Sequence, residues 1–261
     1  MINEFEMKKQ LCEIGRRIYN LGFVAANDGN FSVKISDNEI LCTPTGVSKG
    51  FMTPDMICKI DTKGNILSAN GKYKPSSEIK MHLSVYKNRP DVKSVVHAHP
   101  PYATSYAIAG IPLTKPIMPE AVISLGEVPI AKYGMPSTTE IPDAVEPYLE
   151  YYDAVLLECH GALTYGEDLM TAYFKMESLE FYAKLHHLAD QIGGPKEIPH
   201  NEVLRLYDLR KKMGLSGKHV ADKYVADEGL KEASCTSEVK KDDIAALIEE
   251  VTRRTLAQLT K

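Results

Sequence analysis

Apolar residues in the first quarter of the chain recur first every three to four positions and then in short runs. From Asn3 to Leu21 they follow the helical spacing, which predicts an amphipathic helix that Gly22 ends. Beyond it, runs bounded by turn residues occur at 39–43, 57–61 and 65–68. Such runs are typical of hairpin strands. This part of the chain is therefore expected to be rich in antiparallel strands.

Helical and strand patterns alternate through the middle of the chain. The helical spacing predicts helices over 78–88, 102–109, 141–151 and 167–191. Short apolar runs at 94–98, 128–131 and 153–159 predict strands. The stretch 115–125 resembles a loop, and Phe174, Leu179 and Phe181 of the long helix are expected to face inward.

Residues after the Gly193–Pro195 break are more polar. A basic helix is predicted over 201–213, and the stretch 214–238 contains few apolar residues and is expected to be mobile. A final amphipathic helix is predicted over 244–256. We therefore expect one catalytic domain over residues 1–195 and a polar extension over 196–261 that packs on this domain or on a neighbouring subunit.

Two buried strands are predicted to end in histidine. Residues two apart on a strand point to the same side, so His97 and His99 are expected to aim at one point, where they could share a metal ion. They could equally be ordinary polar residues at a strand end, because two ligands do not fill a zinc shell. His160 ends the second strand and is the candidate third ligand. His186 and His187 lie near a helix end, where exposure is expected, and are not assigned as ligands.

Three polar segments combine hydroxyl, amide and glycine residues in a way that suits anion binding. They are the turn at 27–30, the turn at 43–48, and Ser76 and Ser77 at the start of a helix. Backbone amides in such turns and free N–H groups at helix starts can hold a phosphate. Ordinary turn formation and helix capping explain the same residues equally well.

Composition excludes several classes of protein. Hydrophobic residues make up 44% of the 261 residues and charged residues 25%, which is typical of a globular protein. The net charge of −4 gives no long-range attraction to nucleic acid or to an anionic membrane. The first residues lack the apolar core of a secretory signal, and no apolar run approaches the ~20 residues that span a bilayer. Five scattered cysteines argue against a disulfide framework, so a cytoplasmic location is expected.

Three histidines with a carboxylate at a helix start have the composition of a catalytic zinc site. The sequence resembles the class II aldolase and adducin N-terminal family, and within it the L-fuculose-phosphate aldolase branch. The resemblance covers roughly Phe5 to Leu188 and depends on ordered motifs. They are Gly29-Asn30-Phe31-Ser32-Val33, Thr43-Pro44-Thr45-Gly46, Pro75-Ser76-Ser77-Glu78, Val95-Val96-His97-Ala98-His99 and His160-Gly161-Ala162-Leu163.

The resemblance implies a role for each motif. His97, His99 and His160 would bind one divalent metal ion per subunit, with Zn²⁺ favoured and Mn²⁺, Fe²⁺ or Co²⁺ also compatible. Glu78 would complete the resting metal site and then act as the catalytic acid and base. The remaining residues would hold the phosphate of a small phosphorylated sugar: Asn30, Thr45, Gly46, Ser76 and Ser77.

The implied reaction is cleavage of a short ketose 1-phosphate to dihydroxyacetone phosphate and an aldehyde, by retro-aldol chemistry through a metal-bound enediolate. A sugar-phosphate 4-epimerase or a sugar-acid phosphate decarboxylase on the same fold is the alternative, and a non-catalytic adducin-like module is a remote one. Similar epimerases have aspartate where Glu78 stands. The tyrosines that protonate the aldehyde oxygen in the aldolase branch are not matched here, and Glu120, Tyr133, Tyr207 or Tyr224 could replace them.

The resemblance also implies the fold and the assembly. The expected fold is α/β, a single three-layer α/β/α domain around a central, largely antiparallel mixed sheet. The expected assembly is a homotetramer with four-fold symmetry and sites between subunits.

Overall fold

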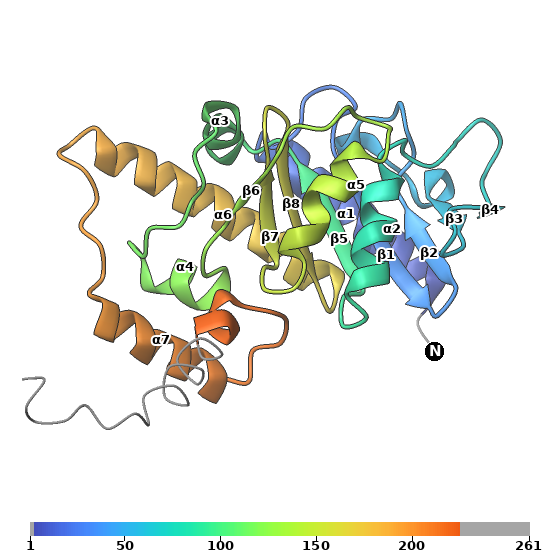
Figure 1. Cartoon of the computed structure of the whole chain (residues 1–261). Coiled ribbons are helices and arrows are strands. Elements are labelled where there is room, and N and C mark those ends of the chain that lie inside the picture. Colours follow the sequence, from blue (N-terminus) through green and yellow to red (C-terminus); the bar gives the residue numbers. More distant parts are fainter. Residues whose placement is uncertain (1–2, 225–261) are drawn as a thin grey trace, which may run out of the picture. The chain divides into compact units, whose positions relative to one another are not determined.

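The computed structural model describes residues 3–224, and its centre is an eight-stranded sheet (Figure 1). The strands lie in the order β4-β3-β2-β1-β5-β8-β7-β6, and every neighbouring pair is antiparallel except β6 and β7. Their bounds are β1 Asn30–Ser36, β2 Glu39–Cys42, β3 Cys58–Ile60, β4 Ile66–Ser68, β5 Ser94–Ala98, β6 Ile130–Ala131, β7 Ala154–Leu157 and β8 Gly161–Gly166. The prediction of a largely antiparallel mixed sheet is confirmed.

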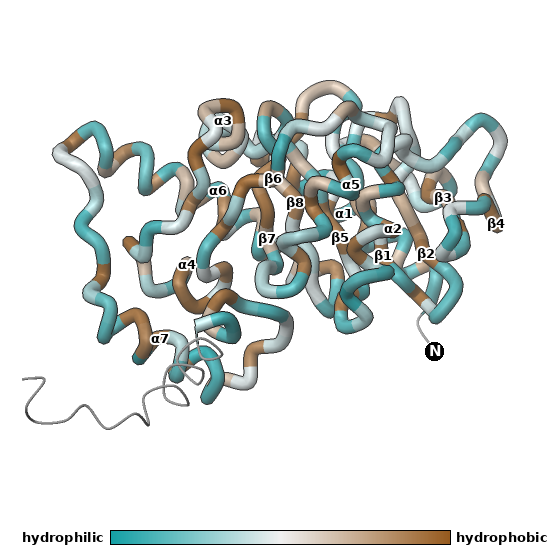
Figure 2. Tube along the Cα trace, viewed as in Figure 1, coloured by the Kyte–Doolittle hydropathy of each residue, from teal (hydrophilic) through white to brown (hydrophobic). Residues whose placement is uncertain are grey.

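Helices cover both faces of this sheet. One face packs against α1 (Glu4–Asn20), α3 (Pro101–Ala109), α4 (Pro119–Ser124) and α6 (Leu169–Asp190). The other packs against α2 (Ile79–Asn88), α5 (Glu140–Val145) and the short η3 (Glu146–Tyr148). Figure 2 shows the apolar residues concentrated on the strands between these helices. The three-layer α/β/α fold is therefore confirmed.

The central strand β5 separates two hydrophobic cores. All five of its residues are buried. Val96 belongs to the core on the α1 and α6 side, whereas Val95 belongs to the core under α2. Because side chains alternate along a strand, His97 lies on the same side as Val95 and faces α2.

Several element boundaries differ from those predicted. The predicted loop 115–125 contains α4, which begins at Pro119, a residue suited to the first helical turn. The helix predicted to reach residue 151 ends at Val145 and continues as η3, where Pro147 removes a backbone donor. Phe174 and Phe181 were predicted to face inward, which is wrong: they are 51% and 52% exposed, whereas Leu179 is buried.

The C-terminal part of the described chain packs on α4. Helix α7 (His200–Lys212) places Arg210, whose Nη1 donates a hydrogen bond of 2.8 Å to the carbonyl oxygen of Ile123. His219 Nε2 lies 2.8 Å from the carbonyl oxygen of Val122. One compact unit therefore extends to Ala221, while the helix predicted over 244–256 lies outside the described residues. The domain boundary at residue 195 and the role of the extension stay predictions.

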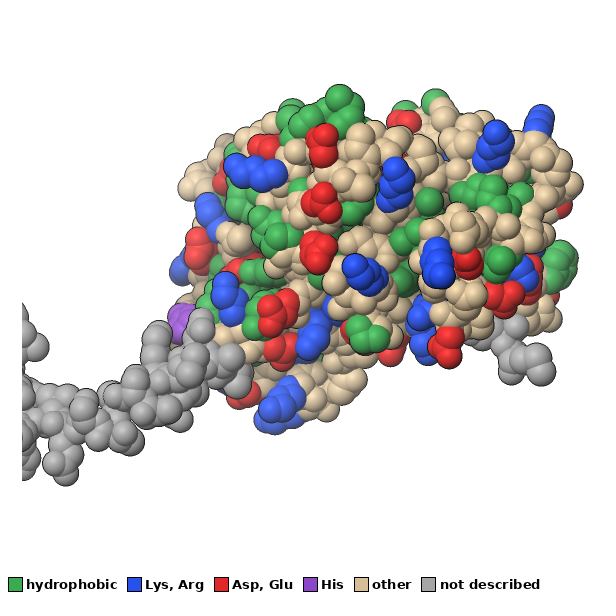
Figure 3. All heavy atoms as spheres, turned by 45° about the vertical axis from the view of Figure 1, so that its right-hand side comes forward, with side chains coloured by type: hydrophobic (Ala, Val, Ile, Leu, Met, Phe, Trp, Pro, Cys, Tyr) green, Lys and Arg blue, Asp and Glu red, His purple; other side chains and the backbone are tan. Residues whose placement is uncertain are grey.

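The surface carries charges of both signs. Figure 3 shows basic and acidic side chains interspersed with apolar ones on one face. This pattern agrees with the small net charge of −4. Within the described part of the chain, none of the helices has both the length and the apolar character that a membrane span requires.

Candidate metal centre

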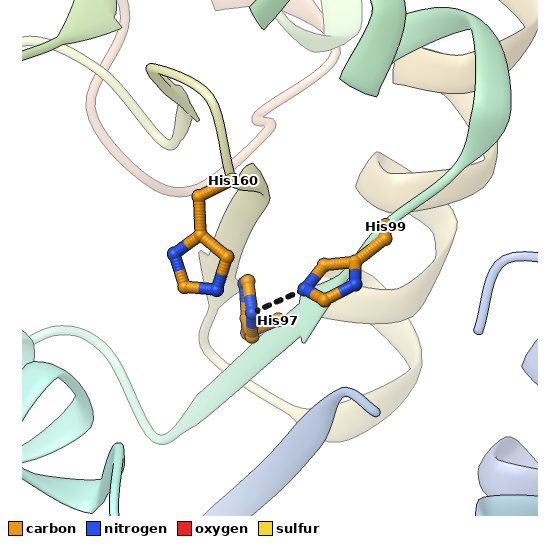
Figure 4. A group of neighbouring side chains, drawn as sticks. All are labelled: His97, His99 and His160. Carbon is orange, nitrogen blue, oxygen red and sulfur yellow. Dashed lines mark hydrogen bonds between the residues drawn. The ribbon is translucent and has the colours of Figure 1, made fainter. Parts of the chain in front are cut away.

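Three imidazole rings converge at one end of the sheet (Figure 4). His97 and His99 come from β5 and the residue just after it, and His160 comes from the turn between β7 and β8. One ring nitrogen from each lies within 4.8 Å of the other two. The rings His97 and His160, which are far apart in sequence, have centroids only 4.7 Å apart. The predicted convergence is therefore present in the structure.

His97 is oriented by the sheet itself. Its side chain is fully buried, and its Nδ1 lies 2.9 Å from the carbonyl oxygen of Ala162 on β8. Because a carbonyl only accepts, Nδ1 carries the proton and Nε2 presents a lone pair. Burial lowers the pKa of His97 to about 3, so the ring is neutral at physiological pH. A neutral imidazole is the form that binds a metal ion.

The other two rings point toward the same place. His99 Nε2 lies 3.1 Å from His97 Nε2, and its Nδ1 lies 3.6 Å from a carboxylate oxygen of Asp28. His160 follows Cys159, a non-glycine residue with a φ of 55° in the left-handed region. Such a backbone is strained and is typical of turns that position functional groups.

Glu78 stands beside this cluster at the start of α2. Its Oε1 lies 3.2 Å from His160 Nε2 and its Oε2 lies 3.5 Å from His97 Nε2. The side-chain amide of Asn30 donates a 2.7 Å hydrogen bond to Oε2. Burial raises the pKa of Glu78, but the neighbouring His97 and His160 and the bond from Asn30 outweigh burial and hold the pKa below its usual range. The group is therefore a carboxylate.

The four residues fit a catalytic zinc site. Three imidazoles would supply nitrogen ligands, and the carboxylate could occupy or leave the position that such sites keep for substrate. The bond between His97 Nδ1 and Ala162 is the outer contact that metal-binding histidines commonly make. These donors suit Zn²⁺ and accept other divalent transition metals.

Gly161 allows the rings to approach so closely. A Cβ at this position would lie 2.6 Å from His99 Cδ2 and 2.7 Å from the carbonyl oxygen of Ala98. We expect Gly161→Ala to destabilise the fold by about 1–3 kcal/mol and to weaken metal binding, because His99 must move. Metal titration and thermal unfolding measure both effects. Gly71→Ala, where a Cβ meets nothing within 4 Å but the φ of 57° strains the backbone, is the control and should lose stability without losing metal affinity. Unchanged metal affinity in Gly161→Ala would contradict this reading of the turn.

The predicted phosphate-binding residues lie next to the cluster in two adjoining turns. Pro44 and Pro75 form an isolated antiparallel bridge. Around it, the Thr45 amide donates to the Lys74 carbonyl at 2.9 Å, and the Ser76 amide donates to the Thr43 carbonyl at 3.2 Å. The structure thus brings Thr45 and Gly46 beside Ser76 and Ser77, and all but Ser76 are exposed.

Other predicted residues take different positions. Asn30 is buried, and its amide nitrogen bonds to Glu78, so a role in phosphate binding stays a prediction. Glu120 is exposed in the first turn of α4, and Tyr133 is 54% exposed after β6. No hydrogen bond or ion pair within residues 3–224 joins either of them to the three histidines. The expected exposure of His186 is wrong, because this ring is buried against the hydroxyl of Tyr106 at 2.7 Å.

A second buried histidine beneath the site was not found from the sequence. The Ser32 hydroxyl lies 2.7 Å from His82 Nδ1 and 2.7 Å from the Tyr86 hydroxyl. His82 and Tyr86 are four residues apart on one helix, a spacing that places them on the same side. Ser32 lies on β1, and the sequence does not specify that α2 packs against this strand. The contact of both side chains with Ser32 is therefore seen only in the structure.

The buried position of His82 leads us to expect that the unfolding free energy falls in acid. Burial lowers its pKa from 6.5 to about 4. Its contribution is therefore complete above pH 6.5 and is lost as the pH falls toward 4, since protonation favours the unfolded chain. Between pH 7 and pH 5 the wild type should lose about 2 kcal/mol more unfolding free energy than His82→Gln. Urea unfolding of both proteins over this range measures the difference, and parallel profiles would contradict the prediction.

The sequence also has informative relatives. The profile of the Class II Aldolase and Adducin N-terminal domain matches residues 9–187. An L-fuculose phosphate aldolase from Methanococcus vannielii is 37% identical over 180 residues, which are 69% of this chain and 95% of that protein. A 3-oxo-tetronate 4-phosphate decarboxylase from Pectobacterium atrosepticum is 31% identical over 187 residues, which are 70% of this chain and 84% of that protein.

Solved structures agree with the sequence relatives. One titled L-fuculose 1-phosphate aldolase has a TM-score of 0.73 and 28% identity, and the similarity covers 80% of this chain and 97% of that one. The family match, the three-layer fold and the three converging histidines together define the class of protein. The chain belongs to the class II aldolase and adducin N-terminal family.

Proposed function

We propose that this protein is a metal-dependent class II aldolase that cleaves a short ketose 1-phosphate to dihydroxyacetone phosphate and an aldehyde. The observation that carries the proposal is the placement of the Glu78 carboxylate, 3.2 Å from His160 Nε2 and 3.5 Å from His97 Nε2. A base beside three metal-binding side chains suits proton transfer at a carbon next to a carbonyl group. The 37% identical fuculose phosphate aldolase supports the same reaction class.

Each residue of the site then has a defined task. His97, His99 and His160 hold the metal ion, which when bound supplies a Lewis acid that makes the carbonyl group a better electron acceptor. In the condensing direction the Glu78 carboxylate takes a proton from the hydroxymethyl carbon of dihydroxyacetone phosphate. In the cleavage direction it returns that proton to carbon. Asn30 keeps Oε2 of Glu78 in place through its 2.7 Å hydrogen bond.

The substrate phosphate would bind at the two adjoining turns. Thr45, Gly46 and Ser77 are exposed there, and Ser76 lies next to Glu78 in the sequence. Hydroxyl and amide donors in such turns suit an anion. The group that protonates the aldehyde oxygen would come from elsewhere, and Glu120 and Tyr133 stay predictions for this role.

A substrate panel tests the reaction. The purified protein is loaded with Zn²⁺, Mn²⁺, Fe²⁺ or Co²⁺ in turn and incubated with fuculose 1-phosphate and related ketose 1-phosphates. We expect release of dihydroxyacetone phosphate, measured by an enzyme-coupled assay. We also expect elemental analysis of the purified protein, before any metal is added, to find Zn²⁺. The matching free ketoses, which lack the phosphate, are the control substrates. No release with any metal would overturn the proposal.

Decarboxylation of a sugar-acid phosphate is the second candidate. It is supported by the 3-oxo-tetronate 4-phosphate decarboxylase that is 31% identical over a similar part of the chain. The same metal centre would serve, because loss of carbon dioxide also leaves electrons that a carbonyl group must accept. Release of carbon dioxide from 3-oxo-tetronate 4-phosphate, with no cleavage of the ketose phosphates, would favour this reaction.

We also propose a homotetramer with four-fold symmetry in the cytoplasm. Support for association comes from α6, where Phe174 and Phe181 are 51% and 52% exposed. Large apolar side chains on a surface helix are common at subunit interfaces. Light scattering measures the mass in solution, and a monomer would contradict this part of the proposal.

A further inference from the structure

A buried lysine contacts both the turn at 27–30, before β1, and the turn that contains Thr45 and Gly46. Lys49 is only 1% exposed and begins the short helix η1 (Lys49–Phe51). Its Nζ donates hydrogen bonds of 2.8 Å to the carbonyl oxygens of Asn27 and Val47. Asn27 belongs to the turn before β1, and Val47 follows Thr45 and Gly46. One ammonium group therefore connects the two turns.

The backbone of Lys49 is fixed against α1. A Cβ on Gly15 would lie 2.4 Å from the carbonyl oxygen of Lys49, and a Cβ on Gly50 would lie 2.5 Å from the ring of Tyr19. Both distances are too short for any side chain, so glycine is required at both positions for η1 to contact α1. The lysine side chain thus has a rigid base from which it reaches the turns.

The charge of Lys49 is only partly compensated. Both hydrogen-bond partners are neutral carbonyl groups, and within residues 3–224 the lysine forms no ion pair. Burial lowers the pKa of Lys49 to about 8, although Asp28 and Glu78 oppose this effect. The group is still a cation near neutral pH. A buried cation without a paired anion is costly unless a ligand supplies the charge.

The residue before Lys49, Ser48, has a buried hydroxyl without a hydrogen-bond partner among the described residues. Buried hydroxyl groups in proteins are normally hydrogen-bonded. An anion bound at the turns would balance the charge of Lys49, and this hydroxyl could donate a hydrogen bond to it.

We propose that Lys49 is a positioning residue that makes the site select phosphorylated ligands, by joining the turn at 27–30 to the turn of Thr45 and Gly46 and placing a positive charge beside them. The inference rests on the proposed phosphate site but not on which bond of the substrate breaks. A lysine that only stabilised the fold would affect every ligand equally. Selectivity for the phosphate group therefore separates the two roles.

Calorimetric titration tests this on the metal-loaded protein. The ligands are inorganic phosphate, dihydroxyacetone phosphate and dihydroxyacetone, which lacks the phosphate. The variants are Lys49→Met, which removes the charge and both hydrogen bonds, and Lys49→Gln, which removes the charge but keeps an N–H donor. Lys63→Met changes the net charge equally at an exposed position and is the control.

We expect both Lys49 variants to bind the two phosphate ligands at least about tenfold more weakly, as the loss of one nearby charge predicts, with dihydroxyacetone affinity and metal content unchanged. Hydrogen exchange at 27–30 and 45–48 should rise in Lys49→Met. Lys49→Gln decides the question if Lys49→Met does not fold. Phosphate affinity within about twofold of wild type, or an equal loss for dihydroxyacetone, would overturn the inference.

The outcome is distinguishable from a failure of the proposed reaction. A wild-type protein that binds phosphate through Lys49 but cleaves no ketose phosphate would leave this inference standing and remove the aldolase. A protein that cleaves the substrate while Lys49→Met keeps wild-type phosphate affinity would do the reverse.

Discussion

Glu78→Gln should retain the metal ion and lose activity by about 10²–10⁴-fold, the usual contribution of a positioned acid or base. Glutamine has the same shape and keeps an oxygen that can accept the 2.7 Å hydrogen bond from Asn30. It cannot take up a proton from carbon. The loss should therefore appear in kcat rather than in KM.

The measurement is kcat for dihydroxyacetone phosphate release, normalised to metal content by elemental analysis. Glu146→Gln removes an equal charge from an exposed position on η3 and should behave as wild type. A Glu78→Gln enzyme with wild-type kcat would show that another group handles the proton.

His97→Asn should bind little metal and lose activity by about 10³-fold or more, because a bound metal contributes several kcal/mol to catalysis. The asparagine amide can replace Nδ1 as donor to the Ala162 carbonyl, so the contact between β5 and β8 need not be lost. The variant should nevertheless be less stable, because a polar group in a fully buried position must find new partners.

Elemental analysis and thermal unfolding report the two effects separately. His160→Asn, in the turn after β7, should lose metal with a smaller loss of stability, because His160 is less buried than His97. His187→Asn, on the exposed end of α6, should change neither. Full metal content in His97→Asn would contradict the assignment of this histidine as a ligand.

Much of the fold could be predicted from local patterns. The helical spacing in α1 and α2 is a strong signal because each of these helices has one distinct buried side, and β5 was found from its short apolar run. Strand β8 (Gly161–Gly166) was missed because it has glycine at both ends and Thr164 in its centre, so its sequence is neither a continuous apolar run nor an alternating pattern. Phe174 and Phe181 were misassigned because a long apolar helix does not indicate which side faces the sheet.

The candidate site was only partly predictable for a related reason. His97 and His99 share a side by strand periodicity alone, and His160 was found because it ends a similar strand. The contact of Asn30 with Glu78 depends on the pairing of β1 with β5, in which Asn30 lies opposite His97. Lys49 was missed because its partners are backbone carbonyl groups, which no sequence motif identifies.

The separation of the histidines along the chain has a mechanical consequence. A metal ion held by His97 and His160 would act as a reversible cross-link between the centre of the sheet and the turn after β7. It would close the long chain segment between them in the folded protein only, because the unfolded chain has no preformed site. Binding would therefore favour the folded state by mass action. Availability of the metal should therefore set how long the protein survives heat and proteases, and not only whether it is active.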